Sequence, residues 1–342
     1  MLKKSLVLAS LSSSRAFMSF PMRGLSTNKL NAMSDAEKYI FDLNGYIVLR
    51  GIFSPEEVAS ANSAIDKHSD DVLERKGVLR NTRNDSGMAG DGLSGRMDLG
   101  GILGWPEGER DFFRSVLAHP KLVPYFTELL GKGYRMDHQP FCIVQNKGSE
   151  GFALHGGMID VESGKFNPFL AYSCVQGQMN NCLLACSVVL TDHNAGDGGF
   201  CVVRGSHKSN FAAPTEMING DAYREFLVQP ETNAGDVILF SESTVHGALP
   251  WTADHQRRVA LYRFAPPTMA YGRSYSPSWP EDMTAGMSQE QLAVMQPPFA
   301  VRLDRQQVQV MGDGEDEIGV VVESRNPKKK AFDKDVFGTD YF

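Results

Sequence analysis

The sequence has little cysteine, no surplus of positive charge and no long apolar run. Its five cysteines are odd in number and never spaced as CxxC, which argues against a zinc site or a disulfide framework. They lie mostly in apolar segments, which is typical of buried free thiols. A net charge of -7 lacks the basic footprint of nucleic-acid binders, and no apolar stretch is long enough to span a bilayer. We therefore expect a small-molecule or protein substrate and no nucleic-acid partner.

The first 34 residues contain no Asp or Glu, although the chain as a whole is acidic. Lysines and arginines alternate there with many serines, a composition typical of a cleaved organellar targeting segment. A mitochondrial and a plastid destination both fit, and a disordered tail is the alternative. The whole chain is 42% hydrophobic and 22% charged, which is ordinary globular composition, and we expect a single domain over residues 35–342.

Helical signals come first in this domain. Residues 54–57 read Ser-Pro-Glu-Glu, a capping box with proline at the first helical position. Two further helical segments are expected at residues 112–117 and 120–130. Between the helices, residues 81–104 hold seven glycines and predict a long loop that serves as a lid or a binding segment, or is disordered.

From residue 134 onward the pattern changes to short β-type runs separated by turn signals. These runs cover residues 141–145, 183–190, 200–203, 237–240 and 259–264. No helical crossover of useful length lies between the later runs, which favours a β-sandwich or jelly roll over an α/β sheet. The expected fold is therefore mainly β, with a jelly-roll core at about residues 134–270 and an N-terminal helical layer.

Three features that can carry chemistry occur in order along the β region. The first is His155, followed by two glycines; the second is the run from Gly235 to Phe240 that leads to His246. The third is Arg257, eleven residues after His246. A lone histidine is weak evidence for a metal site, because most histidines are surface or core residues. The occurrence of all three features in this order is much stronger evidence for a functional site than any one of them.

In these features the sequence resembles the phytanoyl-CoA dioxygenase family of Fe(II)- and 2-oxoglutarate-dependent oxygenases, over roughly residues 40 to 270. The resemblance extends to residues 44–46, 53–57, 190–192, 199–208 and 235–236. In that family an HxD pair and a distal histidine bind iron inside a double-stranded β-helix, and an arginine binds 2-oxoglutarate. The resemblance implies that His155 and His246 bind Fe(II) and that Arg257 binds 2-oxoglutarate. It also implies hydroxylation of a small organic substrate, with release of succinate and CO2.

General chemistry agrees with these roles. Neutral imidazole suits Fe(II), and a guanidinium fork matches a carboxylate and stays charged when buried. Successive residues of a strand point to opposite faces, so of Arg257 and Arg258 only one can face the site. The spacing favours Arg257, and a surface-charge role for the pair is the alternative.

The sequence departs from the family pattern at Gly157, where the carboxylate ligand should stand. Three outcomes are open. In the first, the carboxylate of Asp160 or Glu162, in the loop after His155, turns back to bind the metal, which the two glycines would permit, and the protein is a hydroxylase. Alternatively, chloride fills the vacant position, as in the 2-oxoglutarate halogenases, or the metal site is weakened and the protein is a non-catalytic binding protein.

A second departure is Ala248, where the family carries a polar residue that contacts 2-oxoglutarate. Gln145 and Asn146, on the strand before His155, are candidate replacements. The connection over residues 158–181 contains Phe166, Phe169 and Tyr172, among other aromatic and apolar residues. These aromatics predict either a segment that shields the site from water or part of the core.

Overall fold

The computed structural model describes residues 33–272, 279–299, 306–311, 319–324 and 327–338. Residues 1–32, which make up nearly all of the expected targeting segment, lie outside these ranges, so the organellar destination stays a prediction. The first described helix, α1 (Asp35–Asn44), begins with a capping box between Ser34 and Glu37.

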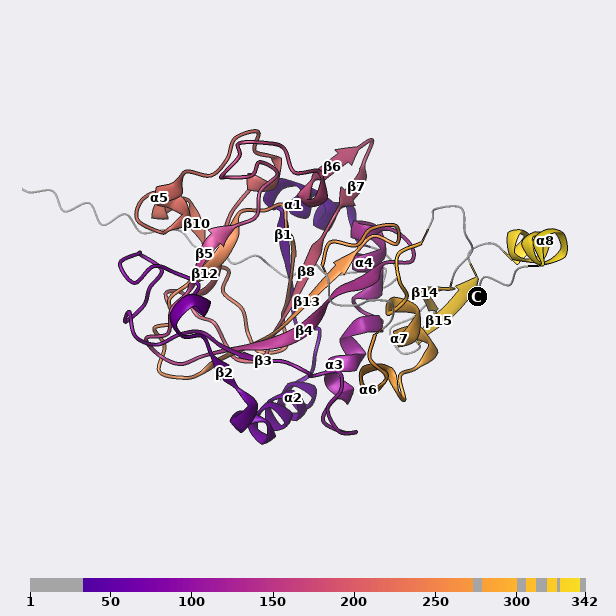
Figure 1. Cartoon of the computed structure of the whole chain (residues 1–342), viewed down its shortest axis with the longest axis horizontal. Helices are drawn as coiled ribbons and strands as arrows, with labels where there is room; N and C mark the ends of the chain where they lie inside the picture. The colour runs from indigo at the N-terminus through magenta and orange to yellow at the C-terminus, as the bar shows by residue number, and fades with distance from the viewer. Residues whose placement is uncertain (1–32, 273–278, 300–305, 312–318, 325–326, 339–342) are drawn as a thin grey trace, which may run out of the picture.

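Two antiparallel sheets stack face to face and form the jelly roll (Figure 1). The major sheet has seven strands: β1 (Tyr46–Leu49), β11 (Val237–Ser241), β8 (Leu184–Val189), β13 (Arg257–Ala265), β4 (Arg135–Gln145), β3 (Met97–Leu99) and β2 (Leu73–Glu74), in that order. The minor sheet has four: β10 (Leu227–Val228), β9 (Gly199–Val203), β12 (His246–Leu249) and β5 (Phe152–His155). Two separate hairpins are formed by β6 (Tyr172–Val175) with β7 (Gln178–Asn181) and β14 (Gln306–Met311) with β15 (Gly319–Ser324). The prediction of a mainly β jelly roll is confirmed.

The remaining helices are α2 (Pro55–Lys67), α3 (Asp111–Ser115), α4 (Val123–Leu130), α5 (Thr215–Ile218), α6 (Glu281–Thr284), α7 (Gln289–Val294) and α8 (Pro327–Phe337). Of these, α5 lies beside β5 of the minor sheet. Figure 1 shows α3, α4 and α7 on one side of β8, β13 and β4, with β5 and β12 on the other. The hydroxyl of Tyr262 donates to the carbonyl of Phe113, and the rings of Phe126 and Phe264 lie 4.4 Å apart. The N-terminal helical layer is therefore present, with α7 from the C-terminal part added to it.

The inner face of the major sheet packs against the minor sheet. Phe240 on β11 meets Phe200 on β9, with ring centroids 4.7 Å apart. Because side chains alternate along a strand, each strand of the major sheet sends one set of residues to the helices and the other toward the minor sheet. The second set forms the cavity described below.

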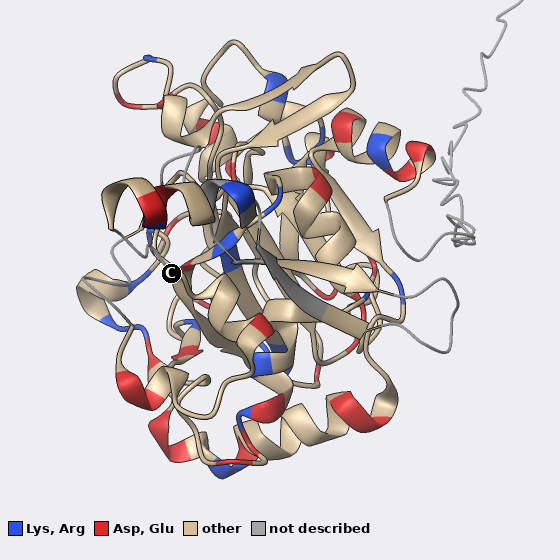
Figure 2. Cartoon of the chain, turned by 90° about the vertical axis from the view of Figure 1, so that its right-hand side faces the viewer, with Lys and Arg blue, Asp and Glu red and all other residues tan. Residues whose placement is uncertain are grey.

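Charged residues of both signs are spread over the helices and loops, whereas the strands are largely uncharged (Figure 2). Within the described ranges, no helix combines the length and apolar character needed to cross a membrane. Cys142, Cys186 and Cys201 are buried free thiols, as predicted, while Cys174 is exposed and Cys182 is half-buried.

Candidate metal centre

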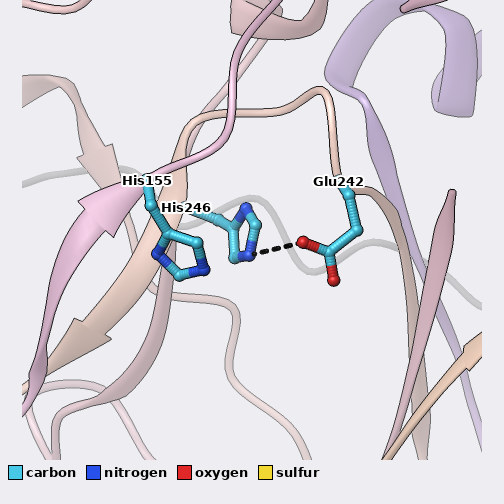
Figure 3. A group of neighbouring side chains, drawn as sticks. All are labelled: His155, Glu242 and His246. Carbon is cyan, nitrogen blue, oxygen red and sulfur yellow. Dashed lines mark ion pairs between the residues drawn. The ribbon is translucent and has the colours of Figure 1, made fainter. Parts of the chain in front are cut away.

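The two histidines that the sequence indicates lie side by side. His155 ends β5 and His246 begins β12, and the two residues are direct partners in the antiparallel ladder. Directly opposed residues point to the same face, so both rings turn into the space between the sheets. Their ring centroids are 4.2 Å apart (Figure 3). The pairing of two short strands thus brings together residues that are distant in sequence.

Each imidazole has one nitrogen held by a backbone carbonyl. Nδ1 of His155 lies 3.1 Å from the carbonyl oxygen of Ala153, and Nδ1 of His246 lies 2.7 Å from that of Thr244. A carbonyl oxygen can only accept, so in each ring Nδ1 carries the proton and donates it. Nε2 of both rings keeps its lone pair, which is the form in which histidine binds a metal ion.

Glu242 joins the two histidines, and sequence reasoning did not find it. It lies in the turn between β11 and β12, four residues before His246, with 6% of its surface exposed. One carboxylate oxygen lies 3.5 Å from Nε2 of His246 (Figure 3). One ligand atom from each of His155, Glu242 and His246 lies within 4.8 Å of the others. Two imidazoles and one carboxylate are the donor set of non-haem Fe(II) oxygenases.

The protonation states of this cluster fit a divalent cation. Burial would raise the pKa of Glu242, but the charge of Arg263, whose Nε donates to Oε1 at 2.6 Å, helps to bring it down to about 2. Burial lowers the pKa of His155 to about 3 and lowers that of His246 as well. At neutral pH a nitrogen lone pair of His246 therefore faces a carboxylate oxygen with no proton between them. A cation bound there would relieve this repulsion.

Asp160, the expected third ligand, does not reach the histidines. Its side chain is exposed, and Oδ1 accepts hydrogen bonds from the backbone N and Oγ of Ser163 at 2.7 and 2.6 Å. A β-bridge between Ile159 and Phe166 closes this segment into a surface turn, and Glu162 is exposed in the same turn. The carboxylate that lies close to both histidines is that of Glu242, on the other side of the site.

The first of the two glycines after His155 makes room for the turn that carries Glu242. A Cβ on Gly156 would lie 2.5 Å from the carbonyl oxygen of Thr244 and 2.6 Å from that of Glu242. Gly156 and Gly157 also have φ values of +89° and +91°, which side chains disfavour. At Gly157, the family position for the carboxylate, the backbone angle alone disfavours aspartate, since a Cβ there would meet no backbone atom closer than 3.9 Å. Gly156 is the residue that permits the close approach of Glu242.

Arg257 lines the same space between the sheets, and its side chain is buried. Its Nη1 donates to Oε1 of Gln145 at 2.5 Å, and Nε2 of Gln145 donates to the carbonyl of Glu150. Nε of Arg257 is buried and has no hydrogen-bond partner among the described residues. Burial, and then the charge of Arg96, lower the pKa of Arg257 to about 9, which leaves it protonated at neutral pH. A buried cation without a counter-charge is strained until an anion binds.

Arg258 faces the other way, as expected from strand alternation. It donates to Asp66 and contacts Asn62, both on α2, on the helical side of the sheet. Gly199, opposite the site, must be glycine because a Cβ there would lie 2.7 Å from Nε of Arg257. The absence of a side chain at Gly199 thus leaves room for the side chain of Arg257 between the sheets.

A cavity of about 290 Å³ connects the histidines to Arg257. Its walls include apolar residues from both sheets and three further arginines, which are Phe141, Ile143, Phe152, Phe200, Phe240, Val259 and Leu261 with Arg75, Arg96 and Arg263. The aromatics of the connection at residues 158–181 do not line it: Phe166 and Phe169 are more than half exposed, and Tyr172 is buried against Asp42 and the His207 ring. The expected shield over the site therefore does not come from these side chains.

The fold and the site define a double-stranded β-helix protein whose inner face carries two histidines and a carboxylate. The model of the family described as Phytanoyl-CoA dioxygenase (PhyH) matches residues 41–259, and the chain belongs to this family. The resemblance predicted from the sequence is confirmed.

Solved structures with the same fold include HygX from Streptomyces hygroscopicus. The structure of HygX with nickel and 2-oxoglutarate bound is 20% identical with a TM-score of 0.56, and the match covers 71% of this chain and 90% of that one. HygX with iron bound is 21% identical with a TM-score of 0.54, over 71% and 90%. HygX with nickel, 2-oxoglutarate and hygromycin B is 19% identical with a TM-score of 0.56, over 70% and 90%. No curated protein matches the chain.

Proposed function

We propose that the chain is an Fe(II)- and 2-oxoglutarate-dependent dioxygenase that hydroxylates a small organic molecule. One observation carries this proposal: a single cavity is lined by His155 and His246, which form a metal-binding set with the adjacent Glu242, and by the cation Arg257, which contacts no carboxylate among the described residues. Family membership supports it. So does the same fold in HygX, which has been captured with iron and with 2-oxoglutarate.

In this proposal each residue has a defined task. Nε2 of His155, Nε2 of His246 and the carboxylate of Glu242 hold Fe(II), while Arg263 keeps that carboxylate ionised and in place. Arg257, oriented by Gln145, binds the distal carboxylate of 2-oxoglutarate with its planar fork. The apolar walls of the cavity exclude water from the reacting centre.

When bound, iron and 2-oxoglutarate supply the oxidising power that places oxygen on a substrate carbon, with succinate and CO2 as co-products. The chloride expectation rested on a missing carboxylate. Glu242 supplies one, so hydroxylation is proposed here and halogenation is not. A non-catalytic protein of the same fold is the outcome that the next experiment would detect.

Anaerobic addition of Fe(II) and 2-oxoglutarate to residues 33–342 is expected to produce the visible metal-to-ligand charge-transfer band of a bound 2-oxoglutarate complex. The band should vanish in His246→Ala, because one of the three ligands is lost. It should remain in His255→Ala, whose ring hydrogen-bonds to the carbonyl of Asp192 instead. Absence of the band in the unaltered chain would contradict the proposal and leave a non-catalytic jelly roll.

Replacing Arg257 by Gln is expected to raise the Kd of 2-oxoglutarate about 100-fold, which corresponds to about 3 kcal/mol. The amide removes the charge that compensates the distal carboxylate while keeping a hydrogen-bond donor near Gln145. Calorimetric titration of the nickel-loaded protein would measure this Kd. Arg258→Gln is the matched control, since Arg258 lies on the opposite face, and its Kd should stay within twofold of the unaltered value. Equal losses in the two variants would argue against Arg257 as the anchor.

A further inference from the structure

A second group of charges lines the cavity at the edge of the major sheet. Arg75 follows β2, and Arg96 and Asp98 flank Met97 at the start of β3. Glu74 pairs with Met97, and the backbone N of Arg75 donates to the carbonyl of Arg96 at 2.9 Å. The side chains of Arg75, Arg96 and Asp98 therefore share one face of the sheet, the one that lines the cavity. We call these three residues the basic edge.

Arg96 is the buried member of the basic edge, with 6% of its surface exposed. Its guanidinium carbon lies 5.2 Å from the ring centroid of Phe152 and 5.8 Å from that of Phe141. Nη2 donates to Asp98 at 3.2 Å, whereas Nε lies 2.9 Å from Oδ1 of Asp98 without hydrogen-bond alignment. Asp98 is also shared with Nε of Arg75. One carboxylate therefore serves two guanidinium groups, which is incomplete compensation for a buried cation.

The basic edge is held in position before any ligand arrives. Glu150, fully buried, accepts hydrogen bonds from Nε of Arg80, from Oγ1 of Thr82 and from the backbone N of Asn81 and Arg96. These hydrogen bonds attach the glycine-rich segment to the connection between β4 and β5. Pre-organised donors bind an anion without an added ordering cost.

Two places in the cavity each carry one positive charge that an anionic group of a ligand can offset. Arg257 contacts no carboxylate among the described residues, and Arg75 and Arg96 share Asp98, which leaves one positive charge at Arg257 and one at the basic edge. Arg263 and its partner Glu242 belong to the metal centre, whose charge is balanced separately. The distal carboxylate of 2-oxoglutarate would offset the charge at Arg257. The other remains at the basic edge. One excess charge matches a carboxylate better than a phosphate monoester, which carries about -1.5 to -2.

We propose that the basic edge binds the substrate and that the substrate is a monocarboxylic acid with an apolar body. The inference rests on the proposed function, because it assigns the charge at Arg257 to 2-oxoglutarate. The carboxylate lies against Arg96 and Arg75, and the apolar body lies along Phe141, Phe152 and Leu261 toward the metal ligands. Arg96 is then a residue that determines substrate specificity.

The test compares carboxylic acids with their neutral amides. The full chain, loaded with nickel and saturated with 2-oxoglutarate, is titrated by calorimetry with butanoate, hexanoate, octanoate, decanoate and 3-phenylpropanoate, each paired with its primary amide. At least one acid is expected to bind at least tenfold more tightly than its amide, without releasing 2-oxoglutarate. Arg96→Gln should remove this preference and leave the Kd of 2-oxoglutarate within twofold, and Arg75→Gln should reduce the preference.

Arg83→Gln is the control, because Arg83 lies on the same segment but pairs with Asp85 and Asp221 at the surface. Circular dichroism checks that each variant is folded, and Arg96→Lys, which keeps the charge, should retain part of the preference. The inference is overturned if no acid binds better than its amide, if the acids displace 2-oxoglutarate, or if Arg96→Gln weakens 2-oxoglutarate as strongly as Arg257→Gln does. Failure of 2-oxoglutarate itself to bind the unaltered chain would instead refute the proposed function.

Discussion

Replacing Glu242 by Gln is expected to lower the affinity for Fe(II) at least 100-fold, or about 3 kcal/mol, and to abolish 2-oxoglutarate turnover. The amide removes the negative charge of the cluster while its oxygen can still accept the hydrogen bond from Nε of Arg263. The loss should therefore come from the metal site and not from an unpaired buried arginine. Competition with a fluorescent metal chelator would measure the affinity, and succinate release would measure turnover.

Asp160→Asn is the matched control, because it also converts one carboxylate of the region to an amide. Asp160 bonds to Ser163 in an exposed turn, so the metal affinity of this variant should equal that of the unaltered chain. A loss of affinity in Asp160→Asn with no loss in Glu242→Gln would mean that the turn at residues 158–166 rearranges to bind the metal. The assignment of Glu242 would then be incorrect.

The large strands could be predicted from the sequence because they are continuous apolar runs. Each of the five predicted runs lies in a strand of the two sheets, apart from the first and last residues of the run at 183–190, and β8 has every residue buried. In a strand buried on both faces, apolar and polar residues do not alternate; instead the strand reads as a continuous apolar run, which is easy to recognise in a sequence. The major sheet extends beyond the expected core because β1, β2 and β3 all precede residue 134.

The strands that carry the histidines could not be predicted in the same way. β5 and β12 have four residues each, and β12 reads His-Gly-Ala-Leu, which has no β-branched residue. Their stability comes from pairing with each other and, for β12, with β9. Local propensity says little about such strands, because the neighbouring strands determine them. The histidines were recognised by their spacing and order and not by their secondary structure.

Glu242 was missed because the family pattern directs attention to the residues after His155. The signal was present on the other side, as an acidic residue in a short turn of small polar residues just before His246. The glycine directly after His155 is the matching signal, since its lack of a side chain allows the backbone of the Glu242 turn to lie close to it. Only the antiparallel pairing of His155 with His246 shows that the two signals belong to one site.

The contribution of the glycine-rich segment to the cavity could be predicted from the sequence only in general terms. A binding role for residues 81–104 was one of the expectations, but nothing in its composition marks Arg96 as a residue of the cavity. Its position follows from β3 adding to the edge of β4 and from the hydrogen bonds to Glu150. Both are long-range contacts, which local sequence patterns do not encode.

Gly156→Ala is expected to destabilise the protein by about 2 to 4 kcal/mol and to lower metal affinity about tenfold. A methyl group there meets the carbonyl oxygens of Thr244 and Glu242 at 2.5 and 2.6 Å, and both belong to backbone, which cannot turn aside as a side chain can. The positive φ of +89° adds its own cost of about 1 kcal/mol. Relief of the clash requires the turn with Glu242 to move away from the histidines.

Gly164→Ala separates these two effects, because Gly164 also has a positive φ, +65°, but a Cβ there meets nothing within 4 Å. The stability of this control variant should fall by about 1 kcal/mol because of the backbone conformation alone, and its metal affinity should not change. Urea unfolding of the metal-free proteins gives the stabilities, and chelator competition gives the affinities. Similar losses in the two variants would mean that the glycine after His155 is needed only for its own backbone angles. A much larger loss in Gly156→Ala, together with weaker metal binding, would show that this glycine is what lets Glu242 take the place of the missing aspartate.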